Sequence, residues 1–176
     1  NWAFSNCSSI TEVIIPSSVT NLGKEAFRNC SSLQKIVFLS QLTEICEYCF
    51  FGCSSLTTLE LPSSVTIIRN YSFSECTSLK KIIIPPTVTL IENSAFRMCT
   101  VLKEIKIPTS LETIEQNVFY DCHSLKNVFI PSNIKKIDNY AFKKCISLSK
   151  ISIPSSVVSF GKGIFSQCKS LKKFIF

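Results

Sequence analysis

Phenylalanine recurs in this chain at a fixed interval of 23 residues, and cysteine recurs at the same interval three positions later. A fixed period of this length is typical of a solenoid, in which each unit is too small to bury its own apolar face and stacks on its neighbours. The spacing predicts one elongated domain, residues 1–176, of about 7.6 repeats that share a continuous core. The two columns are Phe4, Phe27, Phe50, Phe73, Phe96, Phe119, Phe142, Phe165 and Cys7, Cys30, Cys53, Cys76, Cys99, Cys122, Cys145, Cys168.

Each repeat follows the pattern C-x-x-L-x-x-I-x-I-P-x-x-V-x-x-I-x-x-x-A-F-x-x-C, as residues 76–99 illustrate. The L-x-x-I-x-I segment ends in alternating β-branched residues, which predicts a short strand. The proline that follows has no N–H group and ends strand pairing. V-x-x-I predicts a second short strand or an extended turn. A-F-x-x-C fits a single helical or 3₁₀ turn that points its Phe inward, so we expect an α/β repeat solenoid.

These blocks resemble the BspA-like leucine-rich repeats, and the resemblance covers essentially the whole chain. The departures are Leu39 in the proline column, Ser72, Val118 and Ile164 in the alanine column, and Phe160 in the isoleucine column. The resemblance implies a curved solenoid with a parallel β-sheet on one face and short helical turns opposite. It also implies the class of surface-exposed adhesins and antigens of mucosal bacteria and parasitic protists. A shared fold does not fix a ligand.

The composition is that of a packed domain, with 45% hydrophobic and 18% charged residues. No apolar run approaches the roughly 18 residues that a membrane-spanning helix needs, so we expect no transmembrane segment. The chain begins in mid-repeat, which suggests a piece of a longer array whose secretion signal, if there is one, lies elsewhere.

The ten cysteines do not have the spacing of a disulfide or zinc framework. In a stacked ladder, equivalent Cα atoms lie about 4.8 Å apart with parallel Cβ vectors. A disulfide needs Cβ atoms roughly 3.8 Å apart that face each other, and zinc needs four converging ligands. The periodic cysteines are therefore predicted to be a reduced, buried column beside the phenylalanines.

Two further cysteines, Cys46 and Cys49, form a C-x-x-C that in isolation suggests redox chemistry or a metal site. The repeat alignment favours a structural role instead. Cys49 stands in the column that holds alanine in other repeats, and Cys46 stands in a column of Gly, Arg and Glu. We expect Cys49 in the core and Cys46 as the one exposed thiol.

No catalytic constellation can be read from the sequence. His123 is the sole histidine and has no partner Ser or Cys in a recognised motif. Paired carboxylates such as Glu112 and Glu115 fall in exposed turn columns. The chain has four glycines and no Gly-rich phosphate loop. We expect no enzyme activity, no cofactor and no metal site.

Net positive charge is concentrated in the outward positions of the strand segment. Glu12, Glu60 and Glu104 are the only acids there, against nine lysines of a chain whose net charge is +7. A face of one sign favours polyanions and acidic proteins, although such lysines also keep a sheet face solvated. Nucleic acid is not expected, because the face has no Arg and one stacking aromatic, Phe129. The candidate face comprises Lys35, Lys80, Lys81, Lys103, Lys106, Lys126, Lys150, Lys172 and Lys173.

Two weaker signals accompany the lysine face. An aromatic patch is a possible protein contact, although packing between turns explains it equally well; it comprises Tyr48, Tyr71 and Tyr140 in one column with Phe51 and Tyr120 in another. Three N-x-[ST] sequons make Asn6, Asn29 and Asn70 candidate glycosylation sites.

The sequence thus predicts a non-enzymatic recognition module that binds a protein or an anionic glycan on its strand face. We expect it in a secreted or cell-surface adhesin. The alternative is an intracellular interaction scaffold of the same fold. Phe174 and Phe176 stand on a final strand without a polar cap, which predicts either further repeats or end-to-end self-association.

Overall fold

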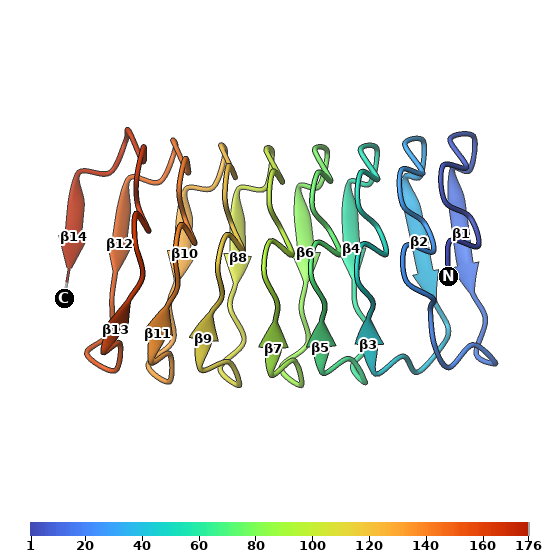
Figure 1. Ribbon diagram of the computed structural model, residues 1–176, viewed down its shortest axis with the longest axis horizontal. Coiled ribbons are helices and arrows are strands. Elements are labelled where there is room, and N and C mark those ends of the chain that lie inside the picture. The colour runs from blue at the N-terminus through green and yellow to red at the C-terminus, as the bar shows by residue number, and fades with distance from the viewer. Residues whose placement is uncertain (176) are drawn as a thin grey trace.

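A computed structural model describes residues 1–175 and shows a parallel-strand β-solenoid in which successive repeats follow one another along a single axis (Figure 1). Two columns of strands run along it. The first contains β1 (Glu12–Ile15), β2 (Lys35–Phe38), β4 (Thr58–Glu60), β6 (Lys81–Ile83), β8 (Glu104–Lys106), β10 (Asn127–Phe129), β12 (Lys150–Ser152) and β14 (Lys173–Ile175). The second contains β3 (Glu44–Ile45), β5 (Ile67–Ile68), β7 (Leu90–Ile91), β9 (Thr113–Ile114), β11 (Lys136–Ile137) and β13 (Ser159–Phe160).

Strand pairing follows the sequence period. Glu12 pairs with Lys35, and Thr58 pairs with Lys81, so each partner lies one repeat along. The ladder in the first column is nevertheless interrupted. It joins β1 to β2, β4 to β6, β8 to β10 and β12 to β14, and no ladder joins these pairs to one another within residues 1–175. The expected parallel sheet is therefore present as four hydrogen-bonded pairs of strands that lie side by side.

The prolines limit strand length as the sequence predicted. Where Leu39 replaces proline, its N–H donates to the Ile15 carbonyl at 2.9 Å. β1 and β2 are each four residues long, whereas the other strands of that column have three. A backbone N–H at this position thus extends the ladder by one residue.

The expected helical turns are wrong, because the described residues contain neither α-helix nor 3₁₀-helix. Two columns have positive φ, between 54° and 69°: the residue before A-F-x-x-C and the residue before its cysteine. Such left-handed residues interrupt the right-handed backbone that a helix needs. The N–H groups also alternate in direction. Ala26 N–H donates to Gly23 within the turn, whereas Phe27 N–H donates to Cys49 of the next repeat. These segments are β-turns whose third residue has the positive φ of type II, and the chain is an all-β solenoid.

The Phe column forms the centre of the core. Adjacent rings stack with centroids 5.2 to 5.9 Å apart and interplanar angles of 4° to 17°. Six of them, from Phe27 to Phe142, are almost fully buried, whereas Phe4 is exposed and Phe165 half-buried. The stacking confirms that each repeat buries its ring against its neighbours.

The periodic cysteines lie beside the phenylalanines, and all ten cysteines of the chain are free. Seven of the eight periodic thiols are buried, Cys7 being half-buried. From Cys30 onward, each Sγ donates to the carbonyl of the Phe 26 residues earlier, at 3.1 to 3.3 Å. The expected buried column is confirmed, with a hydrogen bond that sequence reasoning missed.

The expectation that Cys46 is the exposed thiol is wrong. Cys46 is 7% exposed, because its side chain turns inward and donates to the Leu22 or Gly23 carbonyl at 2.8 and 3.1 Å. Cys49 is fully buried, as its alanine column predicted.

At the other end of the chain, Phe174 lies in β14 with its ring edge-on to Phe165, and Phe176 lies outside the described residues. Self-association stays a prediction, which light scattering would test. No helix among residues 1–175 has the length and apolar character of a membrane span.

Candidate functional site

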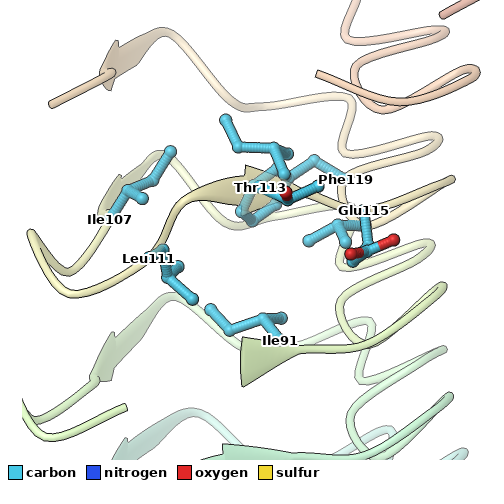
Figure 2. A pocket seen from close by; sticks show the side chains of 8 residues that line it. Ile91, Ile107, Leu111, Thr113, Glu115 and Phe119 are labelled. Carbon is cyan, nitrogen blue, oxygen red and sulfur yellow. The ribbon is translucent and has the colours of Figure 1, made fainter. Parts of the chain in front are cut away.

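A small enclosed cavity in the interior has no room for a ligand. Figure 2 shows aliphatic side chains from neighbouring repeats closing around this cavity, with the Glu115 carboxylate at their edge. Its volume is about 10 Å³, which is at the lower limit for a single water molecule. Burial, followed by repulsion from Asp138, raises the pKa of Glu115. The candidate binding site is therefore on the surface.

The nine lysines of the candidate face are all exposed, on or beside the strands of the first column. Lys35 is neutralised by Glu12, whose Oε1 lies 2.6 Å from the Lys35 Nζ. Within residues 1–175, no ion pair neutralises the lysines of the central strands. This set, called here the central lysine cluster, comprises Lys80, Lys81, Lys103, Lys106 and Lys126.

Two shallow depressions lie within the strand face, each at an interruption of the ladder. One spans β6, β8 and β10, has a volume of about 470 Å³ and is lined by Lys81, Ile83, Lys106 and Phe129 among others. The second, of about 230 Å³, lies between β10 and β12 and also contacts Phe129. Because no ladder joins β6 to β8 or β10 to β12 in the described chain, the hollows coincide with the gaps between paired strands.

Apolar side chains stand between the lysines on this face. Phe129 is 70% exposed and pairs in register with Lys106 of the neighbouring strand. Ile83 is 43% exposed and lines the larger depression with Lys81. Glu104 is the acid that lines this depression. The sequence pointed to the lysines and to Phe129 but missed Ile83, although an isoleucine in an outward strand position is a readable signal.

The remaining lysines of the candidate face lie on or beside strands to either side of the central lysine cluster. Lys35 lies on β2, and Lys150 pairs in register with Lys173 at the far pair of strands, beside Lys172. The lysine face is therefore one central cluster with outlying members at both ends.

Most side chains of the aromatic patch contact one another or a neighbouring cation. Tyr48 and Tyr71 stack at 4.8 Å, and the Arg28 guanidinium lies over Tyr48 and Phe51 at 5.5 and 5.2 Å. Arg97, Lys143 and Lys144 lie 5.4 to 5.7 Å from the centre of the Tyr120 ring. These stacked and cation–π contacts favour packing between turns as the role of this patch.

The other candidate residues are placed as follows. Asn6 is exposed, whereas Asn29 and Asn70 are half-buried. Asn29 Nδ2 donates to Asn6 Oδ1 at 3.1 Å. His123 Nε2 lies 2.5 Å from the Asp121 carboxylate. No group of three or more His, Cys, Asp or Glu side chains among residues 1–175 is arranged to hold a metal ion.

Comparison with known proteins agrees with this architecture. Six copies of the BspA type leucine rich repeat region match residues 1–110 and 89–176. The chain belongs to the BspA-type leucine-rich repeat family. No curated protein matches the sequence.

Solved structures of bacterial leucine-rich repeat proteins are similar to this chain. One from Bacteroides ovatus has 31% identity and a TM-score of 0.83 over 98% of the chain, which spans 51% of that protein. The T. pallidum leucine-rich repeat protein has 30% identity and a TM-score of 0.87, with 92% and 78% of the two chains covered. A protein described as a leucine rich cell surface protein from Faecalibacterium prausnitzii has 32% identity and a TM-score of 0.74, with 99% and 56% covered. The chain thus spans about half the length of the first and third of these proteins.

Proposed function

We propose that this BspA-type repeat domain is a non-enzymatic recognition module that binds an acidic protein partner at the centre of its strand face. The observation that carries the proposal is the larger depression, which spans β6, β8 and β10. There Lys106 of β8 lies between Ile83 of β6 and Phe129 of β10, and Lys81 belongs to the same lining. An apolar hollow rimmed by cations suits an apolar side chain flanked by carboxylates. Aromatic anchors at the centre of a contact supply most of the binding energy in many interfaces.

Electrostatics support the same location. The central lysine cluster has no ion-pair partner in the described chain, so its field acts on an approaching ligand. An anionic glycan is the alternative partner, because the same lysines would attract sulfate groups. The exposed Phe129 and Ile83 favour a protein, since a sulfated glycan offers little apolar surface to cover them.

We further propose that the full-length protein acts at the cell surface, where a repeat array of this kind presents its strand face to other molecules. Support comes from the family match and from the similarity to the Faecalibacterium prausnitzii protein described as a cell surface protein. Protease treatment of intact cells, followed by detection of the full-length protein, tests this part. Cleavage only after lysis would favour an intracellular scaffold.

A peptide-display selection against the chain tests the strand-face proposal. We expect enriched peptides to combine Asp or Glu with an aromatic or aliphatic residue. Phe129→Ser should abolish their binding. Val158→Ser should leave it unchanged, because Val158 is 80% exposed but precedes β13 in the second column. Selected peptides that bind both variants equally would overturn the proposed site, and peptides that carry acids without an apolar residue would favour a glycan-like polyanion.

A further inference from the structure

The C-x-x-C pair, Cys46 and Cys49, has a geometry that its repeat columns alone did not reveal. Cys49 N–H donates to the Cys46 carbonyl at 3.1 Å, which closes a four-residue turn whose third residue, Tyr48, has a φ of 54°. A hydrogen-bonded turn holds its first and fourth Cα atoms within about 7 Å. A disulfide needs Cα atoms about 4.4 to 6.8 Å apart. The backbone of this turn therefore suits a disulfide between its ends.

The two side chains also contact each other. The neighbouring Cys49 side chain is the largest cause of the lowered pKa of Cys46. Burial raises the pKa of Cys49. Cys46 is thus the thiol of the pair that loses its proton more readily, and Cys49 stays protonated beside it.

Cys46 borders a surface cavity, whereas the periodic thiols lie in the core. The cavity has a volume of about 480 Å³, and Lys24, Glu44, Cys46 and Arg69 contribute to its lining. Arg69 lies 2.7 Å from Glu44 and 3.0 Å from Glu92, so the charges around the thiol are largely balanced. A polar disulfide reagent can reach Cys46 through such a cavity. Cys49 has no exposed surface and is not among the residues that line it.

The periodic cysteines provide the internal comparison. Each buried Sγ of that column donates to a Phe carbonyl, and desolvation raises the pKa of Cys76 and of Cys122 to about 12. Thiols that are buried and protonated are inert. Among the buried thiols, reactivity should therefore be confined to the C-x-x-C pair; half-buried Cys7 is the one periodic thiol outside this comparison.

From this arrangement we propose that Cys46 and Cys49 form a dithiol site that exchanges with low-molecular-weight disulfides, Cys46 attacking and Cys49 resolving. In the first step the Cys46 thiolate attacks one sulfur of RS–SR, forming Cys46–S–S–R and releasing RS⁻. In the second step Cys49 loses its proton to the released thiolate and attacks the Cys46 sulfur, which expels the second RS⁻. Two protein thiols are oxidised to one disulfide, and one small disulfide is reduced to two thiols.

The test incubates the folded chain with oxidised and reduced glutathione at graded ratios, followed by acid quenching, alkylation and peptide mass spectrometry. The wild-type chain should lose two of its ten free thiols, with the peptide that contains both Cys46 and Cys49 two hydrogens lighter. Cys49→Ala copies the alanine of neighbouring repeats and should accumulate a glutathione adduct on Cys46. Cys46→Ser keeps a hydroxyl donor for the Leu22 carbonyl and should take no adduct on Cys49.

Cys76→Ser is the matched control, because it changes a periodic thiol and should leave the Cys46–Cys49 disulfide unaffected. Circular dichroism establishes that each variant is folded. Retention of all ten thiols by the folded wild-type chain would overturn the proposal. A disulfide that links either cysteine to another partner, or equal adduct formation on Cys49 in Cys46→Ser, would also overturn it. If a variant does not fold, the disulfide found or not found in the wild-type chain still tests the proposal.

Discussion

At the scale of single residues, the contacts of the cysteine column explain why a thiol recurs at this position of the repeat. Its Sγ fills a gap beside the Phe stack and satisfies a Phe carbonyl of the preceding repeat. Cysteine combines small apolar volume with a weak donor. The repetition of cysteine was readable from the sequence. The carbonyl partner was not, because it lies 26 residues earlier and depends on the path of the turn.

Burial of these thiols predicts sensitivity to alkaline pH. The pKa of Cys76 and of Cys122 is raised from 9.0 to about 12, so above pH 9 the unfolded chain loses protons that the folded chain retains. The contribution of these two thiols to the free energy of unfolding is therefore fully present below pH 9. It declines as the pH rises toward 12, by about 1 kcal/mol per pH unit for each thiol. Chemical denaturation at pH 8 and pH 10.5 measures the loss. Equal stability at both pH values would contradict the protonated column.

Ser72 is a polar residue in the alanine column, fully buried, and its hydroxyl has no hydrogen-bond partner. Removing an unsatisfied buried hydroxyl relieves its desolvation cost. Ser72→Ala should raise the free energy of unfolding by about 1 kcal/mol. Ser63→Ala, at an exposed position, is the control and should change stability little. A loss of stability in Ser72→Ala would show that the hydroxyl has a partner after all.

At the scale of elements, the strands followed from the sequence and the helical turns did not. Alternating isoleucines and a following proline specify a short strand wherever they occur. The A-F-x-x-C segment has apolar spacing that a helical turn and a pair of linked β-turns satisfy equally. The left-handed backbone at two columns selects the β-turns over the helical turn. Glu25 and Met98 belong to these columns, and neither Glu nor Met indicates a positive φ from the sequence.

The positive φ predicts how glycine substitutions differ within one turn. Gln167 has a φ of 63°, whereas Lys169 is not among the positive-φ residues, and both side chains are exposed. At Gln167, glycine relieves the strain of a left-handed backbone. At Lys169, glycine only increases the conformational entropy of the unfolded chain. Gln167→Gly should be more stable than Lys169→Gly by about 1 kcal/mol, measured by chemical denaturation. The reverse order would contradict the β-turn assignment.

At the scale of the whole molecule, stability depends on contacts between successive repeats, because each ring stacks on its neighbours. Phe96→Ala removes one fully buried ring and should cost about 3 to 5 kcal/mol. Its melting temperature should fall by at least about 6 °C. Lys103→Ala, on the exposed face, should stay within about 0.5 kcal/mol of the wild type. Similar melting temperatures for the two variants would show that the Phe column is not the core.

The candidate binding face was only partly predictable from the sequence. Outward lysines follow from strand alternation, because alternate side chains point away from the core. The depression that groups Ile83 with Phe129 depends on where the ladder is interrupted. Strand segments of nearly identical sequence pattern pair in some neighbours and not in others, so no local motif specifies the gap. The site therefore emerges from the stack of repeats and not from any one repeat.

Two charge reversals of equal size test whether the strand face is the binding face. Lys80→Glu with Lys81→Glu alters the central lysine cluster, whereas Lys143→Glu with Lys144→Glu alters lysines that lie over Tyr120 in the turns. Retention on immobilised polyglutamate and on immobilised heparin should fall with salt for the wild type. Once melting curves establish that both variants are folded, the first should lose retention and the second should keep most of it. Equal loss in both variants would contradict a dedicated strand face and leave net charge as the sole cause of binding.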